Sequence, residues 1–220
     1  MSGIESFSKD NLAIWNLQEQ QFFRQLNSPF LIQTYLDNLP YSDDSFYRSP
    51  RRVMQDGKAH CFDGALFTAC ALQFIGHRPL IVDIFADNDD DHLLAIYKVR
   101  NYWGAVAKSN FVGLRFREPG YRNLRELVLS YFESYYNLEK EKTMRGYTVP
   151  LDLSRFYHLQ WMTSDQNLEQ ISDALDRIRH INILTPAMIK ELNPVDERSY
   201  RAGMLGVNEA GLYRPDKNRH

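Results

Sequence analysis

The sequence lacks the features that mark several large protein classes. Its 26 lysines and arginines nearly balance 28 aspartates and glutamates, so no excess positive charge attracts nucleic acid or an anionic membrane. No apolar run approaches the roughly 18 residues of a membrane span, and the first twenty residues lack the basic-then-apolar pattern of a secretory signal. These absences predict a cytoplasmic protein that binds neither nucleic acid nor membranes.

Cysteine is also scarce, with two residues in a chain of 220. Cys61 and Cys70 fall in one predicted helix, where nine residues separate them by roughly 13 Å, beyond the ~7 Å limit for a disulfide. We therefore expect two free thiols, as in a reducing compartment. Cys70 stands among alanine and leucine and is predicted to be a small core residue.

The composition itself is that of an ordinary folded domain. Hydrophobic residues make up 44% and charged residues 25%, and the length fits one buried core with terminal additions. We predict a single domain.

The order of the predicted elements favours an α+β fold. Consecutive strands without helices between them pair antiparallel, and here three strands follow one another. The apolar spacing predicts helices at about 9–26, 29–39, 61–75, 124–137 and 168–181, a turn at 51–54, strands at 80–86, 92–99 and 102–109, a further strand within 147–156, and a frayed end over the last twenty residues.

Cys61 has the position of a reactive thiol. It falls in the first turn of its predicted helix, where the helix dipole and unpaired backbone N–H groups stabilise a thiolate. Such a thiol needs a base, and the base needs a polar group that orients it.

His92, which opens the second predicted strand, is the candidate base. A two-residue turn at Arg100 and Asn101 places His92 opposite Ser109 in the hairpin, and a three-residue turn places it opposite Asn110. Either side chain can fix the imidazole tautomer. The alternative interpretation is a surface histidine at the end of a strand.

An oxyanion formed at such a site needs hydrogen-bond donors. The backbone N–H of Cys61 is one candidate. Gln55, six residues upstream at a spacing similar to that of papain-like proteases, is a second.

Three segments together resemble the transglutaminase-like superfamily, whose fold is related to papain. They are GKAHCFDGALFTACALQFIGHRPLIVDIF, DHLLAIYK and YWGAVAKSN, within a similar region of about 28–137. The resemblance implies a domain with this core and a C-terminal extension at about 138–220, and it points to a bacterial subgroup. It implies that Cys61 is the nucleophile and His92 the general base. An aspartate expected after Trp103 is missing, so Asn110 is the preferred orienting residue and Ser109 the second choice.

A metal-free and cofactor-free Cys-His site on this fold implies acyl transfer on a peptide or protein substrate. Hydrolysis and transamidation both remain open, as does the oligomeric state. A catalytically inactive module that binds a peptide or protein partner is the alternative.

A metal site in the run from Asp87 to His92 is a weaker alternative to a solvated loop. The aromatic residues Tyr131, Phe132, Tyr135 and Tyr136 are predicted to be core, with a binding groove as the alternative.

Overall fold

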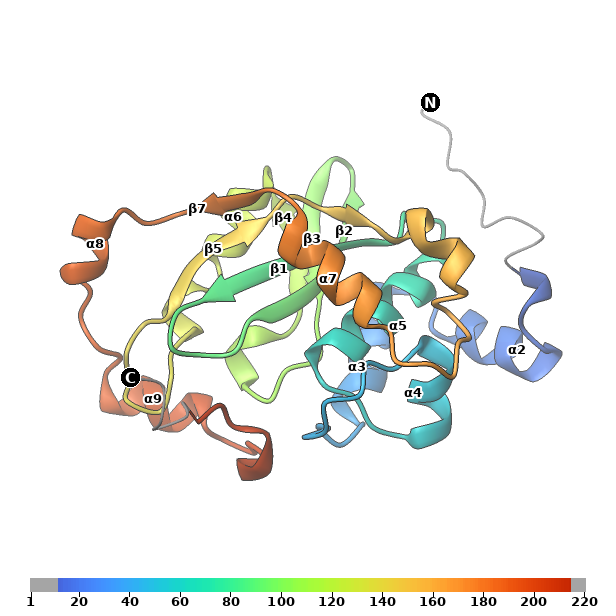
Figure 1. Ribbon diagram of the computed structural model, residues 1–220, viewed down its shortest axis with the longest axis horizontal. Coiled ribbons are helices and arrows are strands. Elements are labelled where there is room, and N and C mark those ends of the chain that lie inside the picture. Colours follow the sequence, from blue (N-terminus) through green and yellow to red (C-terminus); the bar gives the residue numbers. More distant parts are fainter. Residues whose placement is uncertain (1–11, 215–220) are drawn as a thin grey trace.

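The computed structural model describes residues 12–214, which form an antiparallel sheet with helices on both faces (Figure 1). Within these residues the sheet has seven strands in the order β4-β3-β2-β1-β5-β7, and β6 pairs with β1. The strands are β1 Leu80–Ala86, β2 His92–Val99, β3 Tyr102–Val106, β4 Arg117–Tyr121, β5 Met144–Thr148, β6 Leu151–Asp152 and β7 His180–Asn182. All of these pairings are antiparallel, which confirms the predicted α+β class.

Helices α2 to α5 gather on one side of the sheet (Figure 1). The α-helices are α2 Leu17–Gln25, α3 Pro29–Asp37, α4 Pro50–Asp56, α5 Cys61–Phe74, α6 Leu124–Leu129, α7 Glu169–Arg177, α8 Pro186–Lys190 and α9 Glu197–Gly203. The 3₁₀ helices are η1 Val112–Leu114, η2 Phe132–Ser134, η3 Leu153–Leu159 and η4 Glu209–Gly211.

Local capping explains where the first helices begin. The predicted first helix is interrupted: residues 12 and 13 are helical, a turn follows, and α2 begins at Leu17, where the side chain of Asn16 caps it. Residues 9–11 of that prediction lie outside the described part of the chain. The Ser28 hydroxyl accepts a hydrogen bond from the N–H of Leu31 and starts α3 as predicted. The predicted turn at 51–54 is instead α4, a seven-residue helix capped by Ser49.

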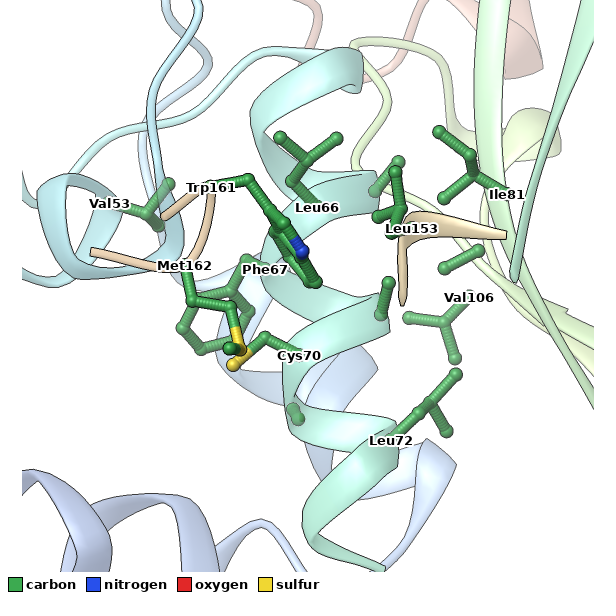
Figure 2. Packing of buried hydrophobic residues seen from close by; sticks show 14 of the residues in the cluster. Val53, Leu66, Phe67, Cys70, Leu72, Ile81, Val106, Leu153, Trp161 and Met162 are labelled. Atoms are coloured by element: carbon green, nitrogen blue, oxygen red, sulfur yellow. The ribbon is translucent and has the colours of Figure 1, made fainter. Parts of the chain in front are cut away.

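Helix α5 is the centre of the larger core. Its side chains pack against α4, the sheet and the segment that carries Trp161 and Met162 (Figure 2). Cys70 is fully buried beside Met162, as predicted for a core thiol, and both cysteines are free. A Cβ placed on Gly64 would lie 2.3 Å from the Cβ of Lys108. Glycine at this position therefore lets the first turn of α5 lie directly on the chain that follows β3.

A second core fills the opposite face of the sheet. Val82, Ile84, Leu94 and Ile96 pack there against α6 and the residues after it, so β1 and β2 carry apolar side chains on both faces. The predicted helix at 124–137 is wrong beyond Leu129, since the chain continues as η2. The tyrosines of the aromatic cluster are nevertheless core, as predicted: Tyr131, Tyr135 and Tyr136 are buried and Phe132 is partly buried.

The β2–β3 hairpin has the predicted turn. Val99 pairs with Tyr102, and Arg100 and Asn101 both have positive φ angles of 50° and 70°, as a tight two-residue turn requires. The two strands pair only as far as Ala95 and Val106, and β3 ends there instead of reaching residue 109.

The C-terminal part of the chain completes the sheet. Strand β5 pairs with β1, and β7 adds to the outer edge of β5. The predicted helix at 168–181 is shorter, as α7, and is followed by β7. The prediction of a frayed end is wrong for residues 201–214, which include the end of α9 and η4; residues 215–220 lie outside the described part.

Candidate functional site

Cys61 opens α5 and faces the beginning of β2. The residue is partly exposed, and its Sγ atom lies 3.9 Å from the carbonyl oxygen of Asp91. The backbone N–H of Leu93 also donates to the sulfur. The thiol is therefore placed against the backbone on both sides of His92.

His92 is buried, with 5% of its surface exposed, and is held through one ring nitrogen. Its Nε2 atom lies 2.7 Å from the carbonyl oxygen of Leu114. A carbonyl only accepts hydrogen bonds, so Nε2 carries the hydrogen and Nδ1 of the neutral ring is left as an acceptor. Burial lowers the pKa of His92 to about 4, which keeps the imidazole neutral near pH 7.

The thiol is also neutral in this arrangement. Burial of the sulfur, followed by the nearby charges of Asp83, Asp90 and Asp63, raises the pKa of Cys61 to about 12, although the Leu93 N–H opposes the shift. The helix start alone favours a thiolate, but desolvation and surrounding carboxylates outweigh it here. Cys61 and His92 are therefore both neutral at rest, without an ion pair between them.

Tyr41 is a site residue that the sequence analysis missed. The Cys61 backbone N–H donates to its hydroxyl oxygen, which also contacts the thiol, and burial followed by the charge of Cys61 raises the pKa of Tyr41. The N–H that was predicted to bind an oxyanion is therefore occupied by Tyr41. A tyrosine just after Pro40 carries no spacing signal that would have identified it.

Ser109 and Asn110 line a small cavity of about 40 Å³ together with Cys61 and His92. Both side chains, however, form hydrogen bonds with residues other than His92. The Ser109 hydroxyl accepts from the N–H of Phe111, and the Asn110 amide binds the backbone of Asn208 and Gly211. Because the hairpin strands separate before residue 109, the carbonyl of Leu114 contacts the imidazole in the place predicted for these side chains.

Gln55 does not reach the thiol. It is exposed on α4, and it is not among the described residues that line either cavity beside Cys61. Pro50 and Val53 are the buried residues of this helix, so Gln55, 200° further round from Val53, points to solvent. The oxyanion role predicted for Gln55 is therefore not supported by its position.

A larger cavity of about 530 Å³ opens beside Cys61. Its charged lining is acidic, and none of the described residues that line it is a lysine or an arginine. The carboxylates are those of Asp43, Asp44, Asp83, Asp90, Asp91 and Asp176. Asp44 is paired with Arg48 and Lys58. Burial, followed by the charges of Asp91 and Asp176, raises the pKa of Asp83 to about 7. The cavity thus holds carboxylates that repel one another.

The acidic run before His92 does not converge on one point. Asp87 pairs with Arg145, Asp89 accepts from the Thr143 hydroxyl, and Asp91 accepts from the N–H of Ala86. Over residues 12–214, no group of three or more histidine, cysteine, aspartate or glutamate side chains is arranged to hold a metal ion.

A buried ion-pair network fixes the chain just before α5. Arg48, 3% exposed, donates to Asp44, Asp56 and Asp63. Asp63 is fully buried at the third position of α5, and it also accepts from the N–H of His60. This network sets the first turn of α5, and with it the position of Cys61.

Comparison with protein-family models and with curated proteins gives no match for this chain. None of the helices within residues 12–214 is long and apolar enough to cross a membrane. The arguments for a function therefore rest on the residues and geometry of the site.

Proposed function

We propose that the protein is a cysteine-dependent acyl-transfer enzyme with a core similar to that of transglutaminase-like and papain-like proteins. Cys61 is the nucleophile, and Nδ1 of His92 is the general base. The observation that carries this proposal is that Cys61 and His92 line the same 40 Å³ cavity, with Nε2 of His92 held by the carbonyl of Leu114 and Nδ1 left as an acceptor. The family resemblance of the sequence leads to the same two residues.

The neutral resting pair favours proton transfer during attack. The Cys61 thiol gives its proton to Nδ1 of His92 as the sulfur bonds to the substrate's carbonyl carbon. The tetrahedral intermediate then collapses, the carbon–nitrogen or carbon–oxygen bond breaks, and the imidazolium returns the proton to the leaving group. Water or an amine attacks the acyl-enzyme in the second half, with His92 again taking the proton. The acceptor determines whether the reaction is hydrolysis or transamidation.

The acidic cavity favours a substrate with a positively charged group. Asp83 and Asp176 line it without an ion pair to any residue within 12–214. A bound ammonium or guanidinium group would relieve their repulsion. The bound cation would also lower the pKa of Cys61, because it would offset the negative charge of Asp83, which raises that pKa. We therefore place a lysine- or arginine-containing peptide, or a polyamine, in this cavity.

The raised pKa of Cys61 supports a second candidate function. A module that only binds a basic peptide has no need of an activated thiol. The same acidic cavity would bind the peptide, and no acyl-enzyme would form.

One experiment separates these two functions. Peptide amides with an aminocoumarin leaving group and Arg, Lys, Ala or Glu beside it are tested for turnover and, by fluorescence anisotropy, for binding. Turnover of the basic peptides that is lost in Cys61→Ala and retained in Cys70→Ser supports the enzyme. Saturable binding of basic peptides without turnover supports the module. If basic peptides show no binding and no turnover, both candidates are overturned.

A further inference from the structure

The C-terminal residues 205–213, referred to here as the strap, lie against the proposed active site. The strap contributes Gly211 and Leu212 to the 530 Å³ cavity and Gly211 and Tyr213 to the 40 Å³ cavity beside His92. Residues 205–208 line a third cavity of about 510 Å³ on the far side of Asn110. Tyr41 lines all three cavities. The strap and Tyr41 therefore border all three cavities, two of which also include Cys61.

Asn110 fastens the strap through both ends of its side-chain amide. Its Nδ2 atom donates to the carbonyls of Asn208 at 2.9 Å and Gly211 at 3.2 Å, and its Oδ1 atom accepts from the N–H of Asn208 at 2.8 Å. Asn208 in turn donates from its own side chain to the carbonyl of Tyr41, at 3.3 Å. These four hydrogen bonds form a latch, three of them between the strap and the chain after β3 and one between the strap and the loop after α3.

The latch acts on the group that covers Cys61. A Cβ placed on Gly211 would lie 2.8 Å from the Tyr41 ring, so the glycine lets the strap lie directly on that ring. The hydroxyl of the same tyrosine occupies the backbone N–H of Cys61 and contacts its thiol. The backbone of Tyr41 is paired with Ala59, and the strap packs on the Tyr41 ring where that ring lies over the nucleophile.

The strap is attached firmly at one end and weakly elsewhere. Helix α9, which precedes it, is fixed by a hydrogen bond from the Tyr136 hydroxyl to the Ser199 carbonyl and by the Lys140–Glu197 ion pair. Beyond α9, residues 205–213 are exposed or only partly buried, and Gly206 has a φ angle of 74°. A segment that buries little apolar surface and is held mainly by a few hydrogen bonds opens more readily than the core.

We propose that residues 205–213 are an autoinhibitory strap, which Asn110 latches over Tyr41 and Cys61 and whose release opens a continuous groove for a peptide. This inference deepens the proposed function, because the covered thiol is the proposed nucleophile. Release of the strap uncovers the Tyr41 ring and opens the cavities beside Cys61 to water, and hydration of the sulfur favours the thiolate.

The test measures alkylation of Cys61 by iodoacetamide in the full-length protein with Cys70→Ser as the background. Asn110→Ala removes three of the four latch bonds, and Asn208→Ala weakens the latch from the strap side. We expect Asn208→Ala, which removes one latch bond, to raise the alkylation rate at pH 8 about fivefold, and Asn110→Ala, which removes three, to raise it by more than about tenfold. Glu209→Ala, an exposed change on the same strap outside the latch, should leave the rate unchanged.

Circular dichroism and thermal unfolding check that the variants keep their fold. Unchanged alkylation rates in both folded latch variants would overturn the strap, and so would equal acceleration in Glu209→Ala. The readout does not depend on turnover, so faster alkylation without hydrolysis of any peptide amide would reject the proposed enzyme and leave the strap intact.

Discussion

The Nε2 atom of His92 lies 2.7 Å from the carbonyl oxygen of Leu114, and this single contact leaves Nδ1 as the free acceptor of the neutral ring. Both residues are buried, at 5% exposure each. A backbone carbonyl thus does for this imidazole what a side-chain carboxylate or amide does in many Cys-His sites. Because the acceptor is backbone, no substitution of a side chain removes it directly.

Two substitutions of His92 should separate its structural contact from its chemistry. His92→Ala leaves a cavity and an unpaired Leu114 carbonyl, which together should lower the free energy of unfolding by about 2–4 kcal/mol. His92→Gln retains an amide donor for that carbonyl and should cost about 1 kcal/mol. Both variants lack the proposed base, so both should lose turnover if the proposed function is correct. Urea unfolding measures the difference, and equal stability losses would show that the Leu114 contact contributes little.

The ion-pair network around Arg48 gives a second prediction. Arg48→Ala leaves Asp63 fully buried without its cationic partner, and we expect a loss of about 3–5 kcal/mol in the free energy of unfolding. The double variant Arg48→Ala, Asp63→Asn removes the stranded charge and should recover part of that loss. Chemical denaturation at pH 7 measures all three proteins. A double variant no more stable than Arg48→Ala would contradict the view that an unpaired Asp63 is the main cost.

Sequence patterns predicted the part of the site that depends on local structure. Strands β1 and β2 match their predicted bounds because apolar residues run through both and acidic residues separate them. The Arg100–Asn101 turn and the starts of α3 at Pro29 and α6 at Leu124 follow from short-range chemistry that is visible in a few residues. The position of Cys61 at the start of α5 was predicted from a local pattern of the same kind.

The remaining part of the site depends on contacts that no local pattern encodes. Asn110 binds Asn208, 98 positions later in the chain, so its partner could not be found from hairpin register. Leu114 contributes only its backbone oxygen, and every residue carries one. The hairpin prediction also assumed that pairing continues to residue 109, whereas the chain after β3 turns toward α5 and Lys108 packs on Gly64.

The third prediction concerns the pH dependence of stability. The pKa of Asp83 is about 7 in the folded protein, above its ordinary value of 3.8. Between these values the folded state binds more protons than the unfolded state, so this residue lowers stability as the pH rises from about 4 to about 7. Asp83→Asn removes the effect and should raise the free energy of unfolding by up to about 4 kcal/mol at pH 8 relative to its effect at pH 4.

Urea unfolding of this variant at pH 4, 6 and 8 tests the sign as well as the size. Asp165→Asn, at an exposed aspartate outside the cavity, is the matched control and should show no such trend. Binding of a basic peptide should reduce the stabilising effect of Asp83→Asn at pH 8, because the peptide's positive charge stabilises the Asp83 carboxylate in the wild-type protein. An Asn variant whose gain in stability is the same at pH 4 and pH 8 would mean that Asp83 ionises normally, and the electrostatic argument for a cationic substrate would lose its main support.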